Sequence, residues 1–139
     1  MQGNIEVMLF RVMEPSPDGL PLVGRSARRL GVRVPHDIPQ DAGGYVHPGT
    51  GGMSVAPSSM WNLPNHRRPK GMGRGSSGPA DDRVYAIEEM ALRSQPLDVR
   101  VDPNAPAVHA FVEPSMRMPL ARYDTSLENT RISWGQAWP

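Results

Sequence analysis

Proline and glycine recur along the whole chain and break it into short segments. The sequence contains 16 prolines and 14 glycines among its 139 residues. Proline cannot donate a backbone hydrogen bond inside a helix or a strand, and glycine weakens both kinds of element. A share this large approaches the level at which disorder competes with folding. Because the chain is long enough to bury one core but too short for two, we expect one loop-rich domain spanning residues 1–139.

Charge and residue usage exclude several classes of protein. The 15 basic and 14 acidic residues give a formal net charge of +1, which demands neither a nucleic-acid partner nor a membrane partner. The absence of cysteine excludes disulfides, thiolate metal ligands and cysteine nucleophiles. No segment approaches the roughly 20 apolar residues of a membrane span. The N-terminus carries acidic Glu6 and no basic region ahead of a long apolar stretch, so we expect a cytoplasmic product without a Sec signal.

The segment from Tyr45 to Pro69 has the composition of a binding site rather than that of a core. It reads YVHPGTGGMSVAPSSMWNLPNHRRP, with glycines, histidines, arginines and hydroxyl residues where a core segment would carry aliphatic side chains. Glycines let backbone N–H groups approach a ligand, and Thr50 and Ser54 supply hydroxyls. The HRR run at 66–68 adds positive charge. This composition favours an anionic, phosphate-bearing small molecule as the ligand.

The first predicted strand, Ile5 to Val12, carries one charged residue on an otherwise aliphatic face. Side-chain alternation places Arg11 on the same side as Leu9. A buried guanidinium needs an anion or several carbonyl groups as partners, because an unpaired buried charge is costly. The alternative is that Arg11 lies just past the end of the strand, in water. The strand pattern alone leaves both interpretations open.

The hydrophobic patterns further along the chain predict short strands and few helices. Strands are predicted at 51–55, 83–87, 97–101 and 108–113, and one helical turn at 58–63. The longest helix is predicted at 119–134, with Trp134 and Trp138 anchoring the C-terminus onto the sheet. A helix at 20–34 would align four arginines on one solvated face: Arg25, Arg28, Arg29 and Arg33. This order of elements favours an α+β fold with an antiparallel or mixed sheet.

Several motifs follow one another in a distinctive order. The chain carries LFR on its first strand, then PGTGGMSV, HRRP and VYAI, and ends with HAFVEPSMRMPLARYDTSLENTRISW. This order, from Leu9 to Trp134, resembles the type VI secretion effector family of small bacterial toxins built on an ADP-ribosyltransferase-like fold. The TGG-x-SV motif and the spacing of the last segment are its most specific parts. The resemblance implies two short mixed or antiparallel sheets that form an NAD-binding cleft with a few flanking helices.

The resemblance also implies a reaction and partners. NAD would be the cofactor, and the toxin would act as an ADP-ribosyltransferase in the cytoplasm of a competing bacterium. It would be made in a bacterial cytoplasm and delivered without a Sec signal. A cognate immunity protein would neutralise it. The acceptor of ADP-ribose, whether protein, nucleic acid, small molecule or water, stays open.

Three residue roles carry over from the family to this sequence. Arg11 matches the first-strand arginine that holds the dinucleotide, and Ser54 matches the hydroxyl that orders the site. The glutamate that contacts the nicotinamide ribose has Glu113 as its first candidate. Glu88 and Glu89, which follow the VYAI strand, are rivals for this role. A carboxylate at this place would stabilise the oxocarbenium-like transition state.

Other candidate contacts come from the loops. We expect the cofactor to meet the glycine-rich loop and the HRR turn, through His47, Thr50, Gly51, Gly52, His66 and Arg67. Thr50 is also the candidate for a second hydroxyl, since position 53 is methionine where a relative can place one. His109 lies in an apolar strand pattern and is interpreted as a core histidine. Four histidines without cysteine or an H-x-x-x-H pattern do not predict a metal site.

Competing functions remain open from the sequence. One is a non-catalytic module that binds the phosphates of a nucleotide or nucleic acid through its arginines. Another is an interaction protein whose proline-rich loops bind a partner. A third is transfer of an RNA 2′-phosphate to NAD by an enzyme on the same fold. Binding of phosphate alone should weaken steeply with salt and should release no nicotinamide.

Overall fold

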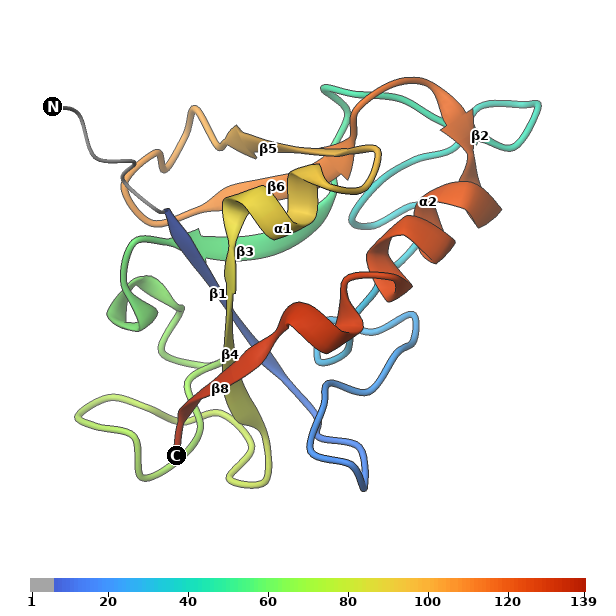
Figure 1. The fold of residues 1–139 in the computed structure, drawn as a ribbon. Helices are drawn as coiled ribbons and strands as arrows, with labels where there is room; N and C mark the ends of the chain where they lie inside the picture. Colours follow the sequence, from blue (N-terminus) through green and yellow to red (C-terminus); the bar gives the residue numbers. More distant parts are fainter. Residues whose placement is uncertain (1–6) are drawn as a thin grey trace, which may run out of the picture.

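A computed structural model describes residues 7–139 as a six-stranded sheet with short helices and long loops (Figure 1). The strands are β1 (Met8–Met13), β2 (Tyr45–Val46), β3 (Met53–Pro57), β4 (Arg83–Glu88), β5 (Leu97–Val101), β6 (Ala110–Pro114), β7 (Met118–Pro119) and β8 (Gly135–Trp138). The helices are α1 (Glu89–Arg93) and α2 (Leu120–Glu128), with 3₁₀ turns η1 (Met60–Asn62) and η2 (Arg131–Ser133). The α+β prediction with an antiparallel sheet is confirmed at this level. Residues 5 and 6 of the first predicted strand lie outside the described residues.

The six-stranded sheet splays apart between two neighbouring strands, β1 and β3. Its strand order is β5-β6-β3-β1-β4-β8, and every pair of neighbours is antiparallel. β1 pairs with β4 along its whole length, whereas β1 and β3 pair only at Leu9 with Pro57 and Phe10 with Ala56. Figure 1 shows these two strands diverging beyond that point. The structure thus has one six-stranded sheet, which splays between β1 and β3, and a second, two-stranded sheet of β2 and β7.

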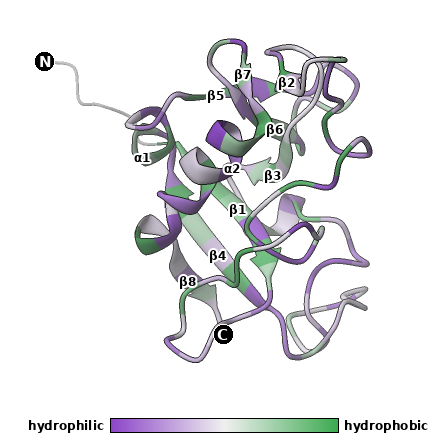
Figure 2. Ribbon diagram, turned by 90° about the vertical axis from the view of Figure 1, so that its right-hand side faces the viewer, coloured by the Kyte–Doolittle hydropathy of each residue, from purple (hydrophilic) through white to green (hydrophobic). Residues whose placement is uncertain are grey.

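The main core lies on one face of this sheet, under α2 and the N-terminal loops. Its largest fully buried side chains include Trp134, Tyr85, Tyr123 and Leu9. A smaller cluster around Val12 and the partly buried Trp138 covers the other face. Figure 2 shows the hydrophobic residues along β1 and β4, with hydrophilic residues frequent in the loops. Both C-terminal tryptophans therefore pack against the sheet, as predicted.

The segment at 20–34 is not helical, and its glycines explain the error. It forms turns and isolated bridges, among them Val23 with Leu30. Gly31 packs so closely that an added Cβ would lie 2.2 Å from the carbonyl oxygen of Gly24. The arginines form ion pairs instead of a helical stripe, for example Arg28 with buried Asp82. The spacing of these arginines, three and four residues apart, therefore does not reflect a helix.

The C-terminal helix is shorter than the hydrophobic pattern predicts. α2 ends at Glu128, and the chain continues through η2 into β8. The Trp134 indole N–H donates to Thr130 Oγ1 at 3.0 Å, and the ring is buried in the core. The remaining residues then pair with β4 as an edge strand.

Tyr123 connects α2 to the strands that border the opening. Its hydroxyl donates to the carbonyl oxygen of Val112 at 2.5 Å and accepts from the N–H of Met53 at 3.2 Å. We expect Tyr123→Phe to destabilise the protein by about 1–3 kcal/mol, because both buried groups lose this partner. Urea denaturation measures the change. Tyr45→Phe is the matched control, since no described residue hydrogen-bonds the half-buried Tyr45 hydroxyl, and equal stability of the two variants would contradict the prediction.

Candidate functional site

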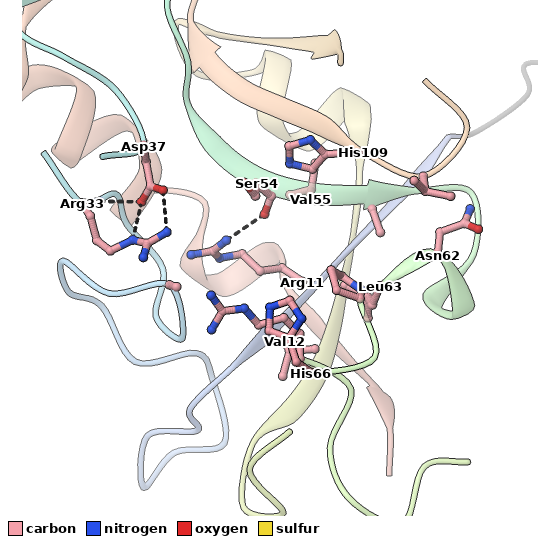
Figure 3. Close-up of a pocket in the computed structure, with 15 residues that line it drawn as sticks. Arg11, Val12, Arg33, Asp37, Ser54, Val55, Asn62, Leu63, His66 and His109 are labelled. Carbon is pink, nitrogen blue, oxygen red and sulfur yellow. Dashed lines mark hydrogen bonds and ion pairs between the residues drawn. The ribbon is translucent and has the colours of Figure 1, made fainter. Parts of the chain in front are cut away.

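A cavity of about 270 Å³ lies at the opening between β1 and β3 (Figure 3). β1 contributes Arg11 and Val12, and β3 contributes Ser54 with its two following residues. Loops complete the wall with polar and charged side chains: Arg33, Asp37, Asn62, His66, Arg67 and His109. The rest of the lining is mostly apolar, including Val55 and Leu63. The cavity thus combines an apolar lining with several charged side chains.

The Arg11 guanidinium is buried in this wall and held by backbone carbonyls. It donates to the carbonyl oxygens of Ser54 at 2.7 Å and Arg29 at 2.8 Å, with longer contacts to those of Ser26 and Gly31. The side chain is 6% exposed. Burial lowers the pKa of Arg11 to about 10, so it stays protonated at neutral pH. The carbonyl-bound alternative of the sequence prediction is therefore correct, and the bond to Ser54 bridges the gap between β1 and β3.

Positive charge exceeds negative charge around the cavity. Asp37 is engaged by Arg33, whose guanidinium donates at 2.8 Å and whose backbone N–H donates at 2.7 Å. Burial opposes ionisation of Asp37, but these bonds outweigh it and lower its pKa. Within residues 7–139, Arg67 forms no ion pair. Three guanidinium groups against one carboxylate leave a surplus of two positive charges, which favours an anionic ligand.

The glycine pair of the TGG motif serves close packing. A Cβ at Gly51 would lie 2.2 Å from the carbonyl oxygen of Asp37, and one at Gly52 would lie 2.4 Å from that of Val112. The Gly52 N–H already donates to the Asp37 carbonyl at 2.9 Å. These glycines do not line the cavity. They bring the Asp37 loop and β6 close to β3, so their part in the site is indirect.

His47 and Thr50 lie in the same loop as the glycine pair but outside the cavity lining. The His47 ring is 2.8 Å from the Asp41 carboxylate, and the Thr50 hydroxyl donates to the His47 carbonyl at 2.8 Å. The hydrogen bond from His47 lowers the pKa of the exposed Asp41 carboxyl to about 2. Both predicted contacts are thus engaged within their own loop.

Glu113 lies on the Ser54 face of the sheet but apart from the cavity lining. Ser54 pairs with Phe111, and alternation along β6 returns Glu113 to the same side. Its carboxylate accepts from Arg100 at 2.9 Å and from the Gly49 N–H at 2.9 Å, and the residue is 6% exposed. Glu113 therefore borders the site as a buried, paired carboxylate.

The two rival glutamates lie elsewhere. Glu88 ends β4 and pairs with Met8 at the beginning of β1, and its neighbour Glu89 binds Arg93 at 2.8 Å. Neither of them lines the cavity.

The structure adds three residues that the sequence interpretation did not place in the site. Asp37 and Arg33 come from a proline-flanked loop, where a salt bridge four residues apart has no helical pattern to reveal it. His109 directly precedes β6 and does not lie in a buried strand. It is one of the residues that line the cavity (Figure 3). The core interpretation of His109 is therefore wrong. The one sequence feature that relates to its position is Asp102, seven residues earlier in the chain, on the other side of a turn between two strands.

Within residues 7–139, no three His, Asp or Glu side chains are grouped so as to hold a metal ion. In the same part of the chain, no helix has the length and apolar character needed to cross a membrane.

Comparisons with known proteins give no relative. No protein-family model matches the chain, and neither a curated protein nor a solved structure matches it.

Proposed function

We propose that this protein is an NAD-dependent ADP-ribosyltransferase-type toxin whose site is the cavity between β1 and β3. One observation carries the proposal: Arg11 of β1 and Ser54 of β3 meet where the sheet opens, in a cavity with surplus positive charge. The motif resemblance assigns these two residues to the same site, although 43 residues separate them in the chain. The splayed sheet also supports a cleft bordered by two groups of strands.

The cavity suits part of a dinucleotide. Pockets that enclose a drug-sized ligand measure roughly 300–1,000 Å³, so about 270 Å³ accommodates one nucleotide half, with the remainder on the surface. Arg67 and His66 lie at the wall with their polar groups available for the pyrophosphate. A guanidinium group can donate two parallel hydrogen bonds to the oxygens of one phosphate. Val55 and Leu63 supply apolar lining for the nicotinamide ring.

The proposed reaction breaks the bond between nicotinamide and ribose. The electron pair of that bond leaves with nicotinamide, which departs as a neutral molecule, and positive charge develops on the ribose. A nearby carboxylate stabilises this oxocarbenium-like state. Glu113 is the first candidate for the carboxylate that stabilises this charge. Asp37, which lines the cavity, is the second candidate. Ser54 orders the site through its hydroxyl while its carbonyl holds Arg11.

The proposed biological setting follows from the motif resemblance. The toxin is made in a bacterial cytoplasm and acts in the cytoplasm of a target cell. A cognate immunity protein protects the producing cell. The acceptor of ADP-ribose, whether protein, nucleic acid or small molecule, defines the toxic effect.

A phosphate-binding module is the second candidate, because the same surplus of charge would attract any phosphate. The arrangement of the other arginines weakens it. Arg25 and Arg28 are engaged by Asp124 and Asp82, and Arg68 is buried among loop carbonyls. They therefore do not form the free basic surface that nucleic-acid binding requires. The third candidate is an enzyme that transfers an RNA 2′-phosphate to NAD, which would use the same cavity.

Thermal denaturation with different ligands separates these candidates. We expect millimolar NAD to raise Tm by several degrees, since a ligand at 100 times its Kd adds about 2.7 kcal/mol of stability. Inorganic phosphate and ADP should raise Tm less, because they lack the nicotinamide half. Equal shifts from NAD and ADP, both lost at high salt, would instead support the phosphate-binding module.

A further inference from the structure

A histidine–aspartate pair lies at the wall of the cavity between β1 and β3, where His109 is one of the lining residues. His109 Nδ1 lies 2.7 Å from Asp102 Oδ2, across the turn that joins β5 to β6. Both side chains are partly buried, with 30% and 16% of their surface exposed. The His109 ring packs edge-on against Phe111, with ring centroids 4.7 Å apart. The ring is therefore held in one orientation by a hydrogen bond and by an aromatic contact.

The pair fixes which ring nitrogen is free. The hydrogen bond from His109 lowers the pKa of Asp102, so this carboxylate is ionised at neutral pH and can only accept. The Asp102 carboxylate also accepts from the Asn104 N–H at 2.9 Å, which fixes its position. Nδ1 of His109 must then carry the proton, and a neutral ring has its lone pair on Nε2. Among the described residues no group hydrogen-bonds Nε2, and the residue lines the cavity (Figure 3).

We propose that His109, oriented by Asp102, is the general base that deprotonates the acceptor, and that the acceptor is a hydroxyl group or water. This inference rests on the NAD-cleaving function proposed above. The acceptor oxygen attacks C1′ of the ribose as the bond to nicotinamide breaks, and its proton moves to Nε2 of His109. The products are an O-linked ADP-ribose, or free ADP-ribose from water, and neutral nicotinamide.

The chemistry of the acceptor follows from the need for a base. A carboxylate acceptor is already an anion at neutral pH and gains nothing from proton removal. A hydroxyl or a water molecule is a weak nucleophile until its proton is taken, and a positioned base typically contributes 10²–10⁴-fold to such a step. A base aligned by a carboxylate therefore indicates an acceptor that loses a proton as it attacks, such as a hydroxyl group or water, and not a carboxylate.

Anion rescue tests this role. Wild type, His109→Ala and Asp102→Asn are incubated with NAD in buffer containing methanol as a small hydroxyl acceptor, with and without sodium azide. We expect nicotinamide release to fall about 100-fold in His109→Ala and about tenfold in Asp102→Asn, which loses the carboxylate that orients the ring. Azide needs no deprotonation, so it should raise the rate of His109→Ala at least about tenfold and form ADP-ribosyl azide, detectable by mass spectrometry.

Controls separate this inference from the function on which it rests. His36→Ala is the matched histidine variant, since His36 is exposed and outside the cavity lining. The NAD-induced rise in Tm should persist in His109→Ala, which shows that the variant folds and binds. Unchanged release from His109→Ala, or a loss that azide does not restore, would overturn the role of His109 alone. No nicotinamide from wild type under any condition would overturn the proposed function together with this inference.

Discussion

Arg11→Ala is expected to remove the NAD-induced rise in Tm and to destabilise the protein. The guanidinium is the donor to the carbonyl oxygens of Ser54 and Arg29, so the variant leaves buried acceptors without this partner. Each such loss costs about 1–3 kcal/mol, and we expect a total on the order of 2–4 kcal/mol because the cost of burying the charge is also removed. Urea denaturation measures the stability, and calorimetric titration with NAD measures the binding.

Two further variants show whether binding and folding are lost separately. Arg11→Lys retains a positive charge but not the planar fork, and we expect it to weaken NAD binding at least about tenfold and to restore only part of the stability, since an ammonium replaces only some of the bonds to the carbonyls. Arg122→Ala is the matched arginine control, because Arg122 is exposed on α2. If Arg11→Lys binds NAD as tightly as wild type does, Arg11 acts only as a clamp between the strands.

Glu113→Gln is expected to lower nicotinamide release about 10²–10³-fold with little change in NAD affinity. The amide preserves the shape and an acceptor oxygen for Arg100 and the Gly49 N–H, but it removes the negative charge that stabilises the developing cation. Single-turnover release of nicotinamide measures the effect, and thermal denaturation verifies that the variant folds.

Asp37→Asn is the informative comparison for Glu113→Gln. Asp37 lines the cavity and is electrostatically coupled to Arg11, whereas Glu113 lies beside the lining. We expect Asp37→Asn to change the affinity for NAD more than the rate of nicotinamide release. The substitution leaves Arg33 without its ion-pair partner and changes the charge around the bound phosphates. The reverse pattern, with release lost in Asp37→Asn and retained in Glu113→Gln, would assign the carboxylate role to Asp37.

Five of the strands, β1, β3, β4, β5 and β6, could be predicted from the sequence because local hydrophobic patterns determine them, whereas β2, β7 and β8 were not predicted. The apolar run that ends near Arg11 and the alternating LDVRV segment became β1 and β5. Helices were predicted wrongly where close backbone packing or turns, which the hydrophobic pattern does not encode, determine the conformation. Gly31 packs against the backbone of Gly24 in the segment predicted as a helix, and the helix predicted at 119–134 ends at Glu128.

The site was predictable only in part, for a related reason. Arg11, Ser54, His66 and Arg67 line one cavity, in agreement with the motif order. The glycine-rich loop was interpreted as a ligand contact because glycines expose backbone N–H groups, yet here they allow β6 and the Asp37 loop to approach β3. His109 and Asp37 enter the site through loop geometry, which has no periodic signal in the sequence.

The most direct test of the proposed function is the release of nicotinamide from NAD by the wild-type protein. The purified protein is incubated with NAD labelled in the nicotinamide ring, and free nicotinamide is separated and quantified over time, beside Arg11→Lys. We predict steady release by wild type and at least about tenfold less by the variant at subsaturating NAD. If folded wild type releases no nicotinamide, even with a target-cell extract supplying acceptors, the cavity between β1 and β3 is not an ADP-ribosyltransferase site.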